Sequence, residues 1–248
     1  MKLLENKVCL VTGTNKGIGH AIVEAFAKQG AIVYAHARTP GCIDEWAETL
    51  STTYETKVVP VYFDLTDLAA ARKSVMAIKT ADNRIDVLIN NAGMVTYEMI
   101  PMVQMDTFRS MIEVNIVGTF NLLQIVSRIM TRQKYGSIIN MASIVADKGA
   151  KGQVSYATTK GAVIAMTKAA AKELAPMQIR VNAVAPGMVG TTRFKAVFEK
   201  SFKERLNNIG MGRLAEPEEI ADMCVFLSSD MSSYVTGQII GVDGSTEL

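Results

Sequence analysis

The stretch KVCLVTGTNKGIGHAIVEAFAKQG, residues 7–30, holds the pattern that decides the fold. Residues 7–12 form a short apolar run rich in β-branched side chains, which is typical of a buried strand. Glycines at 13, 17 and 19 follow and permit a tight turn. The next apolar residues recur at helical spacing until the glycine at position 30: Ile18, Ala21, Ile22, Ala25 and Phe26. Strand, glycine turn and helix predict the opening unit of an α/β fold.

Similar apolar runs alternate with helical patterns along the rest of the chain. They lie at residues 31–36, 57–63, 84–90, 136–142, 178–184 and 237–243. Repeated strand–helix units predict a parallel sheet, and runs that are apolar throughout indicate burial of both sheet faces. We therefore expect one Rossmann-type, doubly wound α/β domain of about seven strands over residues 1–248, with helices on both faces. Pro60 argues against a central position for the run 57–63.

The composition is that of an ordinary folded protein. Hydrophobic residues make up 49% of the 248 residues, and the formal net charge of +2 gives no footprint for nucleic acid or an anionic membrane surface. No run resembles a signal peptide or approaches the ~20 apolar residues of a membrane span. Cys9, Cys42 and Cys224 lack metal-ligand or disulfide spacing, and the first and last lie in apolar runs. We expect a cytoplasmic protein without a metal site, in which Cys9 and Cys224 are buried.

The turn TGTNKGIG, residues 12–19, has the features of a dinucleotide site. Glycines let backbone amides approach a ligand closely, and the N-terminus of the following helix offers free N–H groups to a pyrophosphate. The position of this turn, after the first strand and before the first helix, strengthens that interpretation.

The end of the second predicted strand indicates which dinucleotide binds. A carboxylate there would bind the ribose 2′-hydroxyl of NAD, but this strand ends in Ala37 and Arg38, with no carboxylate before Asp44. Arg38 can bind a 2′-phosphate with two hydrogen bonds, and Lys16 in the glycine turn can add a second positive charge. The sequence therefore favours NADP(H).

The stretch SYATTKGA, residues 155–162, places Tyr156 and Lys160 four residues apart. On a helix these residues share a face, so the ammonium would lie beside the phenol. A nearby positive charge lowers the pKa of a tyrosine and makes it a usable proton donor near neutral pH. The pair alone is a weak signal, because such spacings also occur by chance.

The segment 187–213 is long for a connection between sheet elements, and its middle has the pattern of one or two amphipathic helices. Its basic residues outnumber its acidic ones by a net charge of +4: Arg193, Lys195, Lys200, Lys203, Arg205 and Arg213 against Glu199 and Glu204. We expect a substrate lid here, with a solvated helix face as the alternative.

Further motifs follow at regular intervals: Asp64 and Leu65, NNAG at 90–93, Asn115 in VNIVGTF, Ser143 thirteen residues before Tyr156, and Pro186, Gly187, Val189 and Thr191 in APGMVGTT. Together with the glycine turn and the Tyr–Lys pair, they resemble the short-chain dehydrogenase/reductase family in kind and order. The resemblance covers essentially the whole chain. End to end, the chain is most similar to the bacterial 3-oxoacyl-(acyl-carrier-protein) reductases within that family.

The resemblance implies a role for each matching residue. The bound cofactor would supply the hydride. Tyr156 would protonate the carbonyl oxygen, and Ser143 would hydrogen-bond the same oxygen. Lys160 would hold the nicotinamide ribose and lower the pKa of Tyr156, while Asn115 would hold a water that resupplies the proton. The implied cofactor-binding residues are Gly13, Thr14, Asn15, Lys16, Gly17, Ile18, Gly19, Arg38, Asp64, Leu65, Asn91, Ala92, Gly93, Tyr156, Lys160, Pro186, Gly187, Val189 and Thr191.

The implied function is NADPH-dependent reduction of a ketone, with a 3-oxoacyl thioester of acyl-carrier protein or coenzyme A as the first substrate class, as in fatty-acid biosynthesis. An NADP-dependent alcohol, sugar or steroid dehydrogenase is the alternative, because one set of catalytic residues serves many substrates. A sensor that binds cofactor without turnover is a third. Relatives dock the carrier protein through basic residues; Lys134 matches one such position, whereas Met177 departs from another.

The resemblance also implies a homotetramer built through helices at 104–133 and 156–175 and through the C-terminal strand. Apolar residues of these helices, namely Ile125, Ile129, Ala165 and Ala169, would then lie in interfaces. The alternative is that they pack on the sheet of their own chain.

Overall fold

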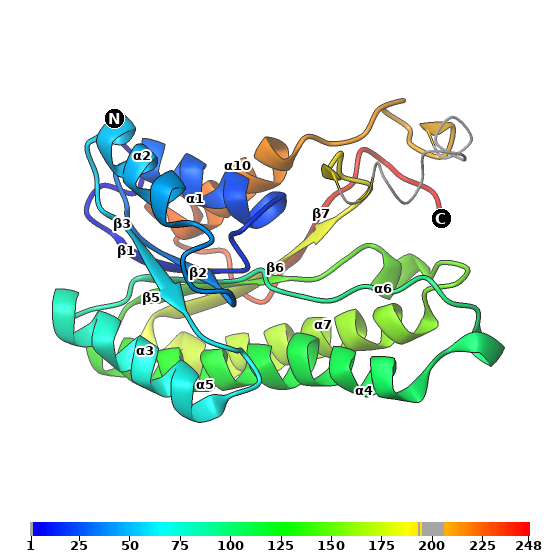
Figure 1. Cartoon of the computed structure of the whole chain (residues 1–248), viewed down its shortest axis with the longest axis horizontal. Coiled ribbons are helices and arrows are strands. Elements are labelled where there is room, and N and C mark those ends of the chain that lie inside the picture. Colours follow the sequence, from blue (N-terminus) through cyan, green and yellow to red (C-terminus); the bar gives the residue numbers. More distant parts are fainter. Residues whose placement is uncertain (1, 193, 195–205) are drawn as a thin grey trace.

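The computed structural model describes residues 2–192, 194 and 206–248. Its strands form one seven-stranded sheet in the order β3-β2-β1-β4-β5-β6-β7, and every neighbouring pair is parallel (Figure 1). The strands are β1 Val8–Thr12, β2 Ile32–Ala37, β3 Val58–Tyr62, β4 Val87–Asn90, β5 Gly136–Met141, β6 Ile179–Pro186 and β7 Ile239–Val242. The predicted doubly wound parallel sheet is confirmed.

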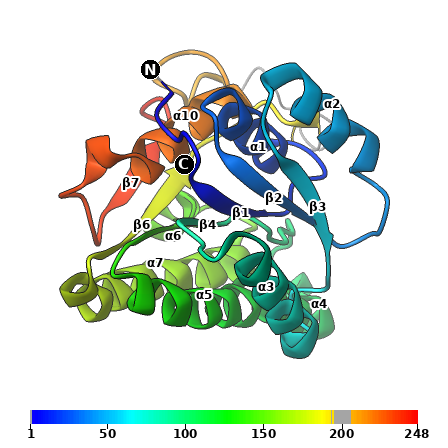
Figure 2. The same ribbon diagram turned by 90° about the vertical axis from the view of Figure 1, so that its left-hand side faces the viewer.

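Helices cover both faces of the sheet (Figure 2). One face carries α1 Ile18–Lys28, α2 Asp44–Tyr54 and α10 Pro217–Ser228, and the other carries α3 Leu68–Asp82, α5 Thr119–Gln133 and α7 Val154–Leu174. Each layer buries its own apolar core against the strands; Phe26 of α1 and Val126 of α5 are fully buried examples. Shorter elements are α4 Met105–Ile112, α6 Val145–Lys148 and the 3-10 turns Ile100–Met102, Ala175–Met177 and Asp230–Ser232.

The edge position of β3 explains how the sheet accommodates Pro60. This residue lies beside Ala35 of β2, and β3 has no strand on its other side in the described sheet. A proline lacks the amide hydrogen that a central strand needs, so an edge strand tolerates it.

The sheet reverses its winding direction between β1 and β4. The chain steps outward from β1 to β2 and β3 and then returns to place β4 on the other side of β1. Ligands in open α/β sheets bind at the carboxyl ends of the strands at this switch point. The segments that follow β1 and β4 are the glycine turn and NNAG, so the topology brings two predicted site motifs together.

A nearly continuous helical run connects α4, a π-helix at Glu113–Gly118 and α5. By length and apolar composition, this run at Met105–Gln133 is the one helix of the described chain that could also cross a membrane. Core helices meet the same criterion, and here Leu122, Val126 and Met130 are buried under the sheet. The run therefore has the packing of a core helix.

The predicted interface residues divide into two pairs. Ile125 and Ile129 are buried within the core of their own chain, so their assignment to an interface is wrong. They face the sheet because they share one side of α5 with other core residues. Ala165 and Ala169 are exposed on α7, and Phe120 of α5 is 47% exposed although the sequence pattern did not single it out. Figures 1 and 2 both show α5 and α7 side by side.

The cysteines are free. Cys9 and Cys224 are completely buried, as predicted, and Cys42 is exposed. Burial raises the pKa of Cys224 to about 12 and also raises the pKa of Cys9, so both thiols stay protonated at neutral pH.

Candidate active site

The glycine turn and the segment after β4 are joined by a compact hydrogen-bond network. The side-chain amide of Asn91 donates to the carbonyls of Thr12 and Gly13 at 2.9 and 3.1 Å. The Thr12 hydroxyl oxygen in turn accepts the backbone amides of Asn91 and Ala92 at 3.0 and 3.1 Å. These bonds close the β1–β4 switch point, so the two loops form one rigid rim.

At two positions of the turn, only glycine fits, because a Cβ would collide with neighbouring backbone atoms. Gly13 has a φ of 70°, and a Cβ there would lie 2.8 Å from the Ala92 Cα. A Cβ on Gly19 would lie 2.2 Å from the Gly13 carbonyl oxygen. Both positions leave the backbone bare at the start of α1, which is the surface that a pyrophosphate needs.

A cavity of about 850 Å³, called the larger cavity below, lies over this rim and extends toward the ends of β2 and β3. Many of the predicted cofactor residues line it: Gly13, Asn15, Lys16, Gly17, Ile18, Gly19, Arg38, Asp64, Leu65, Asn91, Ala92, Gly93 and Thr191. Thr14 does not line it, because its backbone amide and hydroxyl both donate to the carbonyl of His36 inside the protein.

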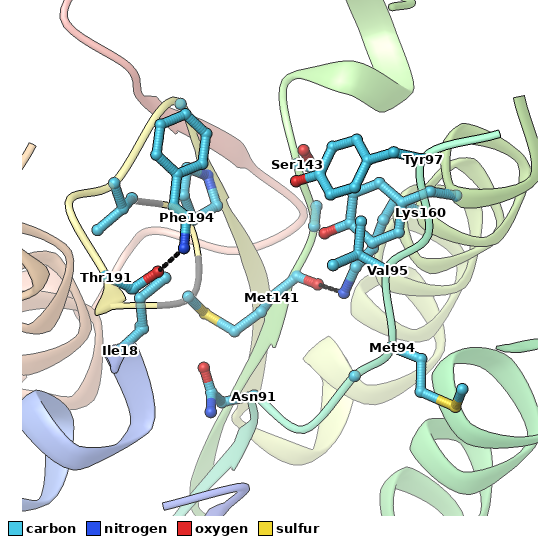
Figure 3. Close-up of a pocket in the computed structure, with 16 residues that line it drawn as sticks. Ile18, Asn91, Met94, Val95, Tyr97, Met141, Ser143, Lys160, Thr191 and Phe194 are labelled. Carbon is cyan, nitrogen blue, oxygen red and sulfur yellow. Dashed lines mark hydrogen bonds between the residues drawn. The ribbon is translucent and has the colours of Figure 1, made fainter. Parts of the chain in front are cut away.

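A smaller cavity of about 210 Å³ adjoins the larger one and shares Ile18, Asn91, Gly93, Met94 and Thr191 with it. It brings together Ser143 from the end of β5, Tyr156 and Lys160 from α7, and the Pro186, Gly187 and Val189 motif after β6 (Figure 3). Residues that are far apart in sequence thus surround one space of the size of a small reacting group.

Lys160 is buried beside Tyr156. Its Nζ donates to the Met141 carbonyl at 2.5 Å and lies 5.8 Å from the centroid of the Tyr156 ring. Burial lowers the pKa of Lys160 to about 8, since no partner charge offsets the loss of water. The side chain nevertheless stays mostly protonated at neutral pH.

Asn115 lies in the π-helix, where the helical ladder is locally widened. Its side chain is 1% exposed and does not line the smaller cavity. The Oδ1 accepts the Met94 amide at 2.7 Å, and the Nδ2 donates to the Met94 carbonyl and to the Thr159 hydroxyl. Thr159 donates in turn to the Tyr156 carbonyl at 2.9 Å. Asn115 therefore connects the segment after β4 to the helix that carries Tyr156 and Lys160.

Three side chains near these groups escaped the sequence analysis. Tyr97 and Phe194 line the smaller cavity on opposite sides, and Tyr97 extends toward Ser143 in Figure 3. His36 lines the larger cavity beneath the glycine turn. A tyrosine, a phenylalanine and a strand histidine have no motif of their own, and only the folded chain shows where they point.

Two segments far apart in sequence supply facing walls of the smaller cavity. Met94, Val95 and Tyr97 come from the segment after β4, and Gly187, Val189, Thr191 and Phe194 supply the opposite wall. Within the described part of the chain, residues 144–155 line neither cavity.

Most of the predicted charge of the lid, carried by Arg193, Lys195, Lys200, Lys203, Arg205, Glu199 and Glu204, lies outside the described residues. Arg213 is described, and its guanidinium forms two hydrogen bonds of 2.7 Å to Glu219 at the start of α10. This pairing holds the pKa of Glu219 at about 2, so Arg213 faces a permanent negative charge.

Comparison with known proteins places this site in a family. A family model described as enoyl-(acyl carrier protein) reductase matches residues 13–245. The 3-oxoacyl-(acyl-carrier-protein) reductase of Thermotoga maritima is 42% identical over 97% of this chain and 98% of its own length. The 3alpha-hydroxysteroid dehydrogenase of Mediterraneibacter gnavus is 37% identical over 98% of both chains.

Solved structures agree with the sequence relatives. L-Sorbose reductase from Gluconobacter frateurii, in complex with NADPH and L-sorbose, has a TM-score of 0.93 at 28% identity and matches 99% of this chain and 98% of its own. An NAD+-bound xylitol dehydrogenase has the same TM-score at 29% identity over 97% of this chain and 99% of its own. The chain belongs to the short-chain dehydrogenase/reductase family of oxidoreductases, which bind a nicotinamide cofactor.

Proposed function

We propose that this protein uses NADPH to reduce the ketone of a 3-oxoacyl thioester to a secondary alcohol. The observation that carries the proposal is the meeting of Ser143, Tyr156 and Lys160 in one small cavity that opens onto the cofactor-sized cavity over the glycine turn. Full-length similarity to several 3-oxoacyl-(acyl-carrier-protein) reductases supports the substrate class.

The shape and charge of the larger cavity fit a phosphorylated dinucleotide. Gly13 and Gly19 are part of its rim, where a Cβ would collide with the Ala92 backbone and the Gly13 carbonyl, so the turn stays tight. Lys16 and Arg38 both line it, and the position that would carry an NAD-selective carboxylate is Ala37. Arg38 and Lys16 would bind the 2′-phosphate, and Asp64 and Leu65 would contact the adenine. Similarity to solved structures does not distinguish NADPH from NADH as the cofactor, since of the two related structures named above one carries NADPH and the other NAD+.

The bound nicotinamide would supply the hydride, and the chain's own residues would manage the proton. Tyr156 would donate its hydroxyl proton to the ketone oxygen as that oxygen gains charge. Ser143 accepts the Val145 amide at 3.3 Å and would donate its own hydroxyl proton to the same ketone oxygen. Lys160, charged and buried below Tyr156, would hold the ribose hydroxyls and favour the charged state of the phenol.

Asn115 would complete the proton path by its position. Its Oδ1 accepts one hydrogen bond from the Met94 amide, and a carbonyl oxygen has two lone pairs. The second lone pair can hold a water next to Lys160, because both groups lie close to one point beside Gly93: a Cβ there would be 3.2 Å from the Asn115 Oδ1 and 3.6 Å from the Lys160 Nζ. This water would return a proton to Tyr156 through Lys160 after each turnover.

Lys134 and Met177 bear on how a carrier protein would dock. Lys134 is exposed at the end of α5 and can attract an acidic partner, whereas Met177 packs against the core under α7. We propose that a carrier protein, where it docks, is held through Lys134 and the basic segment 187–213 rather than at Met177. A homotetramer and a cytoplasmic location complete the proposal.

A hydroxysteroid or similar alcohol is the second candidate substrate. The aromatic walls formed by Tyr97 and Phe194 suit a flat apolar ring system, and a 3alpha-hydroxysteroid dehydrogenase is among the relatives.

A substrate panel decides between the candidates. The purified protein is assayed with 3-oxoacyl thioesters, simple ketones and 3-oxosteroids, each with NADPH and with NADH, at the nicotinamide absorbance. We expect the highest kcat/KM for a 3-oxoacyl thioester with NADPH. A steroid that exceeds every thioester would establish the second candidate instead, and the absence of turnover with all substrates would show that the reductase assignment is wrong.

A further inference from the structure

His36, the residue before the last residue of β2, holds the start of the glycine turn. It is 3% exposed and lines the larger cavity from below. Its backbone carbonyl accepts the Thr14 amide at 2.9 Å and the Thr14 hydroxyl at 3.1 Å. Its ring Nδ1 lies 3.3 Å from the Gly13 backbone nitrogen, which donates to it. The backbone amides of Gly13 and Thr14, the first two after β1, therefore both donate hydrogen bonds to His36.

The other ring nitrogen of His36 contacts the opposite side of the cavity. Its Nε2 lies 2.9 Å from the Phe63 carbonyl oxygen, and the His36 and Phe63 rings are 4.1 Å apart between centroids. A carbonyl can only accept, so Nε2 carries the proton, and Nδ1 is left with the lone pair that Gly13 needs. The hydrogen bonds thus select one neutral tautomer of the imidazole.

The two contacts of the ring belong to the two loops on either side of the proposed adenosine site. Gly13 opens the glycine turn, and Phe63 immediately precedes Asp64 and Leu65. On its other side, Gly13 is already held close to Ala92. We propose that His36 is a positioning residue for the cofactor: its neutral imidazole ties the glycine turn to the end of β3 and fixes the width of the adenosine end of the cavity. This inference rests on the proposed function of that cavity as the cofactor site.

Protonation of the His36 ring should break its hydrogen bond with the Gly13 amide. A second proton on the ring would sit on Nδ1 and face the Gly13 amide, so that two donors oppose each other. Asp64, beyond Phe63, acts on the ring, and the other charged residues that line the same cavity are Arg38 just after β2, Lys16 in the glycine turn and Glu113 of the π-helix. Burial lowers the pKa of His36 despite the opposing effects of the Phe63 carbonyl and Asp64, so the ring is neutral at pH 7 and charges only in acid.

Two substitutions separate the two hydrogen bonds. In His36→Asn, the amide oxygen occupies the place of Nδ1 and can still accept from Gly13. In His36→Gln, the amide nitrogen occupies the place of Nε2 and can still donate to Phe63, but the acceptor for Gly13 is lost. We expect the dissociation constant for NADPH, measured by fluorescence titration at pH 7.5, to rise about 3- to 10-fold in His36→Gln and to change less in His36→Asn.

The pH dependence of binding supplies a readout that a merely structural role would not move. Between pH 7.5 and pH 5, NADPH binding to the wild type should weaken more than binding to His36→Asn, which has no ring to protonate. Titration of the cofactor's 2′-phosphate affects both proteins, whereas the mutual effect of His36 and Asp64 on each other's pKa is part of what the substitution removes. Should His36→Gln fail to fold by thermal melting, this comparison still tests the proposal.

The outcomes are distinct. Parallel pH profiles for wild type and His36→Asn, or equal losses in the Asn and Gln variants, would overturn the role of His36. A wild type that binds neither NADPH nor NADH would instead overturn the proposed function. A wild type that prefers NADH would correct the cofactor, and the same variants would then be titrated with NADH.

Discussion

The cavity proposed for the cofactor and the cavity proposed for the substrate are built in different ways. The larger cavity rests on short motifs that directly follow β1, β2, β3 and β4, and hydrogen bonds between neighbouring strand ends lock them together. The smaller cavity is walled by single residues from 94–97 and 187–194, segments that follow different strands. Local motifs are repeated across a family and can be recognised, whereas walls made of scattered side chains vary with the substrate. We therefore expect the motifs of the first region to select the cofactor and the scattered walls of the second to select the substrate.

Substitution of Tyr156 by phenylalanine tests the point where the two regions meet. The change keeps the ring that lines the smaller cavity and removes only the hydroxyl. Loss of a general acid costs ~10²–10⁴-fold, so turnover should fall by at least that factor while NADPH still binds with its wild-type dissociation constant. Steady-state kinetics and cofactor titration measure the two effects separately. A variant that keeps more than a tenth of the turnover would show that another group supplies the proton.

Exchange of the charge at the end of β2 tests whether cofactor preference can be changed without changing substrate preference. Charge-assisted hydrogen bonds from Lys16 and Arg38 contribute ~1.5–3 kcal/mol each, so the wild type should prefer NADPH over NADH by at least about 100-fold in kcat/KM. The double variant Ala37→Asp, Arg38→Leu should reverse this preference without changing the ranking of carbonyl substrates. Equal wild-type efficiency with both cofactors would remove the assignment of Arg38.

The burial of Lys160 gives the catalytic region a pH-dependent stability. Because its pKa falls from 10.5 to about 8 on folding, the unfolded chain binds more protons than the native chain between these values. The protein without cofactor should therefore gain stability as pH rises through that window, by up to ~3 kcal/mol from this one group.

Urea unfolding at pH 7.5, 9 and 10.5 measures the effect, with Lys160→Met as the control that lacks it. If the difference in free energy of unfolding between the two proteins is the same at all three pH values, the lysine is not buried as an ammonium.

The smallest expected effect concerns the basic segment 187–213. Between about 50 and about 300 mM salt, the screening length falls from ~14 to ~6 Å, so attraction of a substrate that carries phosphate or an acidic carrier should weaken. We expect kcat/KM to drop by roughly up to tenfold for a 3-oxoacyl thioester and to hold for a neutral ketone.

Replacement of Arg193, Lys195 and Lys203 by glutamine should reproduce much of that drop at low salt. If neutral ketones have the higher kcat/KM and their kcat/KM depends on salt as much as that of thioesters, the basic residues of the segment are only solvated and do not attract the substrate.

The sequence by itself determined the seven parallel strands, the glycine turn between β1 and α1 and the Tyr–Lys spacing, and its resemblance to a family implied the other residues proposed for the chemistry. It could do so because β-branched runs, glycines that need bare backbone, and a Tyr–Lys pair one helical turn apart depend on neighbours in the chain. Pro60 likewise indicated from the sequence that its strand is not central, and β3 lies at the edge of the sheet.

Only the tertiary structure decided which side of a helix or strand each remaining residue faces. It buried Ile125 and Ile129 in their own core while leaving Phe120 exposed, and it turned Tyr97 and Phe194 into the smaller cavity. It also placed His36 between Gly13 and Phe63, which are 23 and 27 residues away from it in sequence. Such contacts depend on the order in which strands assemble and on the rotation of each helix, so they exist only once the sheet and its two helical layers have packed together.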